Sequence, residues 1–197
     1  MIFGENPIRP SELVGELNRR ATETAQKLDP LERNTAWTAA VKQALAAITE
    51  ARRGKPYYID HRGNSEFLLD FVWWDEGPSG KRALLGAECE WGNPRENDPE
   101  RRAGAVIDDF EKLLQFKAPL KLMVFGADNP EMQEVICANL QKYLRSFAQH
   151  VQGETYVFVD FAPRHVCCAW TCEIARDGRD EALDLKGLDL ASVSAVV

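Results

Sequence analysis

Apolar residues recur along the chain at two spacings, and the spacing separates predicted helices from predicted strands. Helical spacing predicts a first helix over residues 11–27. A second helix is predicted to begin at the capping-box-like "DPLE", with Asp29 as N-cap, and to end before Gly54. Two further helices are predicted to start after Asp98 and Asn129, because each of these capping residues precedes a proline at the first helical position.

Shorter runs rich in aromatic and β-branched residues predict strands. The order of elements is helix, three strands, helix, strand, helix and two strands, which predicts an α/β fold with a mixed sheet flanked by helices. A turn containing two glycines and a proline separates the second strand from the third. The predicted strands span residues 56–61, 66–75, 82–91, 120–127, 155–162 and 165–175.

The length of 197 residues predicts one domain with small additions at its ends. Residues 1–28 are expected to form an N-terminal helical extension. Residues 29–176 are expected to form the α/β domain, and residues 177–197 a polar, weakly patterned C-terminal tail.

Composition limits the classes of protein that the chain can represent. A hydrophobic content of 45% and a charged content of 28% are typical of a globular protein, and no apolar run approaches the roughly 18 residues of a membrane span. The net charge of −7 excludes a protein that coats nucleic acid with a basic surface. Five cysteines without regular spacing indicate reduced thiols, and no signal peptide is visible, so a cytoplasmic protein without a membrane partner is expected.

Three acidic residues fall in segments that otherwise resemble buried strands. Glu88 and Glu90 are two positions apart within strand 82–91, so they share one face of the sheet. A hairpin turn centred near residue 79 places Asp70 opposite Glu88, within about one step of register. Two unit charges about 5 Å apart repel by roughly 3 kcal/mol at an effective dielectric constant of about 20. A hard divalent cation with oxygen ligands is the simplest way to relieve this repulsion.

The alternative is a solvated strand face on which glutamates alternate and pair with lysine or arginine. Asp70 favours the metal site, because it lies in the middle of "FLLDFVWW", where a charged residue without a partner is costly.

With Asp70 on one strand and "ECEWGN" on the next, the sequence resembles the PD-(D/E)xK nuclease superfamily, which includes the restriction endonucleases. Asp70 matches the first acid and Glu88 the second, while Glu90 takes the place of the lysine, as in E-x-E variants. The resemblance covers roughly residues 30–165 and implies a restriction endonuclease-like mixed β-sheet flanked by helices, with an α-β-β-β-α-β core. The chain departs from the pattern in two ways: no lysine stands at position 90, and no proline precedes Asp70.

The resemblance implies a metal-dependent nuclease that hydrolyses phosphodiester bonds of a nucleic acid, with DNA as the expected substrate. Asp70, Glu88 and the carbonyl of Cys89 would hold Mg²⁺ or Mn²⁺, and Glu90 would orient or deprotonate the attacking water, or share a second ion. Lys112, on the following helix, is the candidate for the displaced basic residue, and its alternative is an ordinary solvated lysine. The alternative function is a catalytically inactive protein that keeps the nuclease fold as a binding or interaction module. A homodimer is among the assemblies that the sequence allows.

Overall fold

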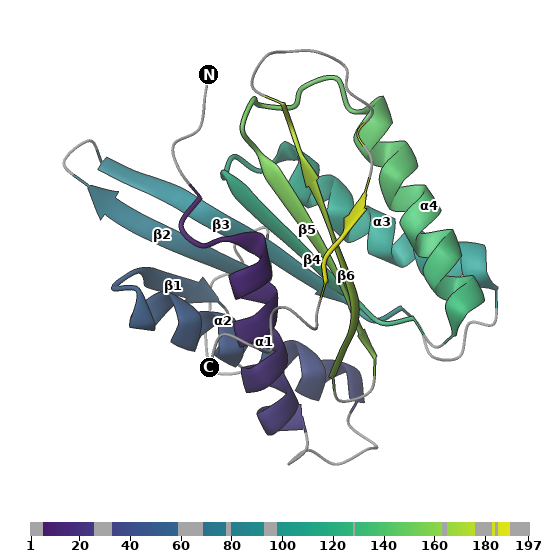
Figure 1. The fold of residues 1–197 in the computed structure, drawn as a ribbon, viewed down its shortest axis with the longest axis horizontal. Helices are drawn as coiled ribbons and strands as arrows, with labels where there is room; N and C mark the ends of the chain where they lie inside the picture. The colour runs from purple at the N-terminus through teal and green to yellow at the C-terminus, as the bar shows by residue number, and fades with distance from the viewer. Residues whose placement is uncertain are drawn as a thin grey trace.

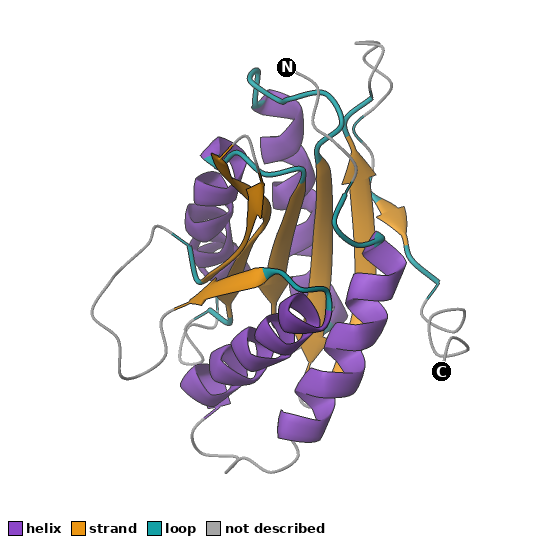
Figure 2. Cartoon of the chain, turned by 90° about the vertical axis from the view of Figure 1, so that its left-hand side faces the viewer, coloured by secondary structure: helices purple, strands orange, loops and turns teal. Residues whose placement is uncertain are grey.

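The computed structural model of the chain describes residues 6–25, 33–58, 69–77, 80–92, 98–127, 129–162, 165–175, 183 and 185–189. Its described part forms one mixed sheet with helices on both faces, as the sequence predicts (Figures 1 and 2). None of the helices in these ranges is long and apolar enough to cross a membrane.

The sheet has seven strands in the described residues, and their spatial order follows the chain. The central strands β3, β4 and β5 are parallel, and all other neighbours are antiparallel. Parallel neighbours need crossover connections, which α3 and α4 supply. The strands are β1 (Lys55–Tyr58), β2 (Phe71–Gly77), β3 (Gly80–Glu90), β4 (Leu120–Phe125), β5 (Thr155–Ala162), β6 (His165–Glu173) and β7 (Lys186–Gly187).

Four helices are described: α1 (Pro10–Ala25), α2 (Arg33–Ala51), α3 (Pro99–Gln115) and α4 (Pro130–Ser146). Two of the predicted N-caps are confirmed. The side chain of Asp98 accepts a hydrogen bond from the Glu100 N–H at 3.0 Å, and Asn129 accepts one from the Met132 N–H at 2.9 Å. The predicted cap at Asp29 lies outside the described residues.

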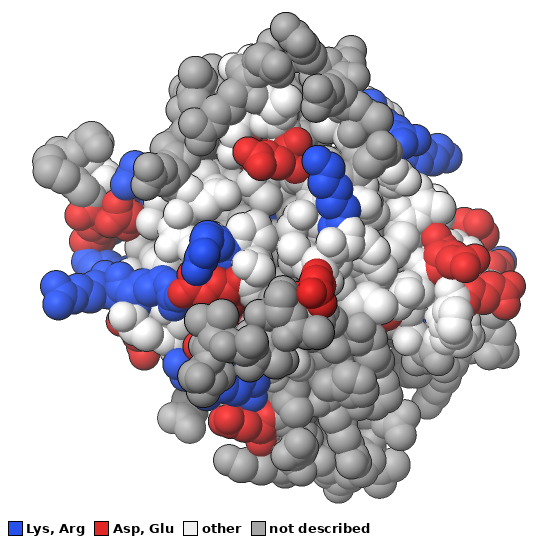
Figure 3. All heavy atoms as spheres, in the orientation of Figure 1, with Lys and Arg blue, Asp and Glu red and all other residues white. Residues whose placement is uncertain are grey.

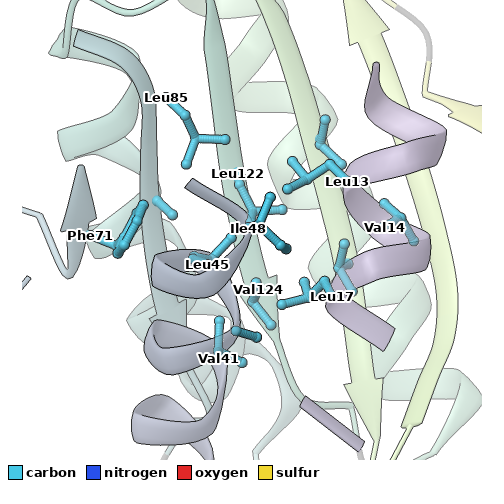
Figure 4. Packing of buried hydrophobic residues seen from close by; sticks show 14 of the residues in the cluster. Leu13, Val14, Leu17, Val41, Leu45, Ile48, Phe71, Leu85, Leu122 and Val124 are labelled. Carbon is cyan, nitrogen blue, oxygen red and sulfur yellow. The ribbon is translucent and has the colours of Figure 1, made fainter. Parts of the chain in front are cut away.

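Two apolar cores fill the space between the sheet and its helices. Leu13, Val14 and Leu17 of α1 meet apolar residues of α2 on one face of the sheet, so α1 and α2 share a core (Figure 4). On the opposite face, α3 and α4 cover a second core that includes Phe110 and Leu140. Both sides of the central strands are therefore shielded from water, which explains why all six residues of β4 are buried.

An irregularity in the β2–β3 hairpin sets the register of the candidate site. Trp73 lies opposite Leu85, whereas Trp74 lies opposite Ala83, so Leu84 has no partner of its own on β2. Such a bulge shifts every pair beyond it by one residue, and a shift of one residue exchanges the two faces of a strand.

The second strand differs at its start from the predicted segment 66–75. The strand begins at Phe71, which pairs with Ala87, and Leu69 and Asp70 form a bend just before it. Residues 66–68 lie outside the described part of the chain. Asp70 is therefore at the end of the β2–β3 ladder, where its side chain can reach the backbone of the neighbouring strand.

Candidate functional site

Asp70 and Glu88 contact each other at the end of the β2–β3 ladder, as the register predicts. The Asp70 N–H donates a hydrogen bond to Glu88 Oε2 at 3.3 Å, and the Cys89 N–H donates one to Asp70 Oδ2 at 3.0 Å. The Asp70 carboxylate thus takes the place of a strand carbonyl as acceptor for β3. These two bonds hold the two carboxylates side by side.

Glu88 is the buried member of the pair. Its side chain is only 3% exposed, and Oε1 has no hydrogen-bond partner among the described residues. Burial raises the pKa of Glu88 to about 8, and the negative charges of Asp70 and then Asp109 add to the effect. A buried carboxylate oxygen without a donor is an expensive feature, and either a proton or a cation would relieve it.

A lysine from the opposite layer neutralises Asp70. Lys42 of α2 places its Nζ 2.6 Å from Asp70 Oδ1, and its side chain is 14% exposed. The sequence offers no signal for this contact, because Lys42 lies off the apolar stripe of α2 and Asp70 is far from it along the chain. Packing of α2 against the sheet brings the two residues together.

A second lysine lies on the Glu88 side of the pair. Lys112 of α3 has its Nζ 3.6 Å from Glu88 Oε1 and 2.5 Å from Asp109 Oδ1. Partial burial disfavours its charge, but the hydrogen bond to Asp109 and the charge of Glu88 outweigh this and raise the pKa of Lys112. Asp109 was not among the predicted residues, although its spacing of three from Lys112 on a helix could have indicated the pair.

Glu90 shares the sheet face of Glu88 but does not join the carboxylate pair. Its Oε1 accepts the Gly92 N–H at 2.5 Å, so its carboxylate turns towards the end of its own strand. Burial raises the pKa of Glu90, and the bond from Gly92 partly offsets this. The structure therefore brings together two of the three predicted carboxylates.

The Cys89 side chain lies on the other face of the sheet, in the α1/α2 core. Burial, and next the charge of Asp70, raise the pKa of the Cys89 thiol well above its usual value. The thiol is thus an apolar core group, and only the backbone of Cys89 faces the carboxylate pair.

The charges of the site nearly balance without any ion. Two ammonium groups, from Lys42 and Lys112, face the carboxylates of Asp70, Glu88 and Asp109. One negative charge is in excess when all five groups are ionised. A proton on Glu88 or a bound cation would compensate this excess.

The donors fit a hard cation in part. Two adjacent carboxylates and one buried oxygen without a hydrogen-bond partner are suitable ligands for Mg²⁺ or Mn²⁺. Across the described ranges, however, no group of three or more His, Cys, Asp and Glu side chains is placed to hold a metal ion. Any ion here would need water or backbone oxygens to complete its shell, which is common for Mg²⁺.

The face drawn in Figure 3 shows no basic surface among the described residues. On the face drawn in Figure 3, acidic and basic side chains of the described residues are interspersed, without a large patch of one sign. On that face, a phosphate group would meet no basic surface among the described residues that attracts it.

No family model matches the chain, and no curated protein matches it either.

Proposed function

We propose that the protein is a metal-dependent nuclease of the PD-(D/E)xK type that hydrolyses phosphodiester bonds in DNA. The observation that carries the proposal is the contact between Asp70, in the bend before β2, and Glu88 on β3: the Asp70 N–H donates a hydrogen bond to the Glu88 carboxylate, and the Asp70 carboxylate accepts one from the next residue, Cys89. Acids held this close repel each other when ionised, and a bound cation would offset that repulsion.

The order of elements supports the restriction endonuclease-like fold of the proposal. A helix, α2, is followed by the antiparallel meander β1–β2–β3, by the crossover helix α3 and by β4, which lies parallel to β3. This is the α-β-β-β-α-β order that the sequence resemblance implies. The positions of the two acids support the proposal, since Asp70 directly precedes β2 and Glu88 is on β3.

In the proposed mechanism, Asp70 and Glu88 hold Mg²⁺ or Mn²⁺, with the Cys89 carbonyl as a further ligand. The bound ion would lower the pKa of a water molecule and offset charge on the phosphate. Lys112, at 44% exposure, is accessible to a phosphate oxygen beside Glu88, which makes it a candidate for stabilising developing charge. Glu90 lies two residues further along β3, where its elevated pKa would suit a group that exchanges a proton with water.

The second candidate function is a binding module without catalysis. The observation that favours it is the pairing of Asp70 with Lys42, since an ammonium group already neutralises one of the two proposed ligands. The absence of a third acidic ligand among the described residues points in the same direction. The nuclease and the binding module differ in one measurable property: only the nuclease cleaves nucleic acid when a divalent cation is added.

The test is a cleavage assay with the full chain. Single- and double-stranded DNA and RNA are incubated at low salt with Mg²⁺, with Mn²⁺ and with EDTA, since phosphate contacts weaken steeply with salt. We expect metal-dependent cleavage of DNA that falls about 100-fold or more in Asp70→Asn and Glu88→Gln. Asp75→Asn is the matched control, because Asp75 lies on the same strand but pairs with Arg82 at the surface.

Cleavage that survives EDTA, or that persists in the Asp70→Asn protein, would contradict the proposed site. Metal binding is followed separately by thermal shift, because an ion that binds the folded state raises its stability by RT ln(1 + [L]/Kd). A metal-dependent shift without cleavage of any substrate would favour the binding module.

A further inference from the structure

The two carboxylates of the site are each approached by a lysine, and the two lysines come from opposite layers. Lys42 reaches Asp70 from α2, and Lys112 reaches Glu88 from α3. Each lysine thus lies beside one of the two carboxylates that would hold a divalent cation. The two lysines differ in how close they lie to these carboxylates and in what else holds them, and this difference separates their roles.

Lys42 makes the closer contact. Its Nζ is 2.6 Å from Asp70 Oδ1, which is the distance of a strong charge-assisted hydrogen bond. Among the described residues, its only ion pair is the one with Asp70. A divalent ion on the same carboxylate would stand within a few ångströms of this ammonium group, where the two positive charges repel each other strongly.

Lys112 is held in a different way. Its Nζ is 3.6 Å from Glu88 Oε1, beyond hydrogen-bond range, but 2.5 Å from Asp109 Oδ1. Asp109 therefore keeps Lys112 in place whether or not Glu88 binds a cation. Among the described residues no hydrogen bond reaches Glu88 Oε1, although it is buried, so its lone pairs remain available to a cation.

We propose that Lys42 is a built-in competitor of the metal: its ammonium group occupies the cation position at Asp70, and a divalent ion binds by displacing it. This inference rests on the proposed function and adds the regulation of its metal site. The flexible stem of lysine allows the displacement, because Lys42 is partly exposed and can turn its ammonium group towards water. Lys42 then sets the metal concentration at which the site fills, and Lys112 does not.

The competition has a second consequence in the metal-free protein. Lys42 stabilises the Asp70 carboxylate and thereby the end of the β2–β3 ladder, where Asp70 accepts the Cys89 N–H. Removing the ammonium group should therefore weaken the metal-free fold while it strengthens metal binding. A residue that merely supports the site would change both quantities in the same direction.

The experiment measures binding of Mn²⁺ alone to the full chain by titration calorimetry, at one pH and low ionic strength. The variants are Lys42→Met, Lys112→Met and, as a matched control, Lys142→Met, since Lys142 is an exposed lysine of α4. We expect Lys42→Met to bind Mn²⁺ at least about tenfold more tightly than the unaltered protein, because a nearby like charge is removed. Lys112→Met should have the smaller effect, less than about threefold, because Lys112 is held by Asp109, lies 3.6 Å from Glu88 Oε1 and need not be displaced when the ion binds. Lys142→Met should leave the Kd unchanged.

Circular dichroism and thermal unfolding check each variant, and Lys42→Gln replaces Lys42→Met if the latter does not fold. Tighter binding by the Lys42 variant together with a lower metal-free Tm supports the proposal. Binding that is unchanged or weaker in the Lys42 variant, while the unaltered protein binds Mn²⁺ and cleaves DNA, overturns this inference and leaves the proposed function standing. If the Lys42 variant binds Mn²⁺ tightly but neither protein cleaves any substrate, the inference holds and the nuclease function fails. If neither the unaltered protein nor the Lys42 variant binds Mn²⁺, the competition by Lys42 and the proposed nuclease function are both wrong.

Discussion

The backbone N–H of Asp70 donates a hydrogen bond to Oε2 of Glu88, although the two residues are 18 positions apart in the chain. The contact joins the bend before β2 to a buried carboxylate on β3. A substitution at either residue should therefore disturb the position of the other, and variants of both residues can test the same contact.

Glu88→Gln should remove a pH dependence of stability in the metal-free protein. The folded protein keeps a proton on Glu88 up to a pKa of about 8, whereas an unfolded chain releases it near the ordinary value for glutamate. Between these two pH values the folded state binds more protons, so the free energy of unfolding falls as pH rises and levels off above pH 8. The loss is at most several kcal/mol, at about 1.4 kcal/mol per pKa unit.

Glutamine has the same shape but no such proton, so the variant should gain stability relative to the unaltered protein from pH 5 to pH 9. Urea denaturation in EDTA at each pH measures this difference. Glu111→Gln, an exposed position on α3, is the control and should follow the unaltered protein. Equal pH profiles for the Glu88→Gln variant and the unaltered protein would show that Glu88 is ionised in the folded state.

Lys121→Met should destabilise the fold because it removes the ammonium partner of a buried carboxylate, that of Glu154. Lys121 Nζ is 2.8 Å from Glu154 Oε1, both side chains are almost completely buried, and the ammonium group also donates to Leu114 O and to the Tyr156 hydroxyl. Removing one partner of such a buried pair costs about 3–5 kcal/mol. Urea denaturation at pH 7 measures the loss, with Lys117→Met at an exposed position as control.

The double change Lys121→Met and Glu154→Gln should recover part of that loss, since no buried charge is then left alone. A single variant that costs less than about 1 kcal/mol would mean that water reaches Glu154 easily.

Gly86→Ala should disturb both stability and metal binding. A Cβ at this position would lie 2.7 Å from Phe116 Cδ1 and 2.8 Å from Leu69 Cδ1, which is too close for either contact. Overpacking of this kind costs about 1–3 kcal/mol. Because Leu69 directly precedes Asp70, its displacement should also weaken Mn²⁺ binding in calorimetry.

Gly104→Ala is the matched control, since its Cβ would have no atom within 4 Å. It lies in α3 and should be neutral or stabilise by up to about 1 kcal/mol. Adding Phe116→Leu to Gly86→Ala should restore part of the stability. A Gly86→Ala protein as stable as the unaltered one would show that both side chains move aside freely.

Asp160→Asn should loosen the start of α4. Asp160 Oδ1 accepts the Ala127 N–H at 3.0 Å, and Oδ2 accepts a hydrogen bond from Gln133 Nε2 at 2.5 Å. Asparagine has one acceptor oxygen, so one of these donors loses its partner, at a cost of about 1–3 kcal/mol.

Hydrogen exchange by NMR should show faster exchange of the Ala127 amide or of the first turn of α4 in this variant. Asp108→Asn, at an exposed position on α3, should leave exchange at both places unchanged. Unchanged exchange in Asp160→Asn would mean that the asparagine keeps both bonds by rotation and a bridging water.

The features that local chemistry decides could be predicted from the sequence. The caps at Asp98 and Asn129 are confirmed because a capping side chain bonds to a backbone N–H only two or three residues away. The fifth strand is confirmed over Thr155–Ala162, since its run of alternating aromatic and β-branched residues has no competing helical pattern.

Features that depend on distant parts of the chain escaped prediction. The strand before the hairpin was predicted to contain Asp70, but the ladder ends at Phe71, and its end depends on where pairing with β3 stops. Glu90 was expected to join the metal site, but its carboxylate caps the Gly92 N–H, a turn that periodicity does not reveal. Lys42 gave no signal, because nothing near it in the sequence indicates that α2 packs beside Asp70.

The sequence by itself determined the order of the elements and, through strand alternation, the common face of Glu88 and Glu90. Tertiary structure decided the rest of the site. The bulge at Leu84 adds the one residue of register that puts Glu88 rather than Ala87 beside Asp70. Packing of helices on both faces then buries Glu88 and brings in its counter-charges. Burial and charge pairing depend on which surfaces meet across the sheet, and that is a property of the folded chain, not of any short segment of it.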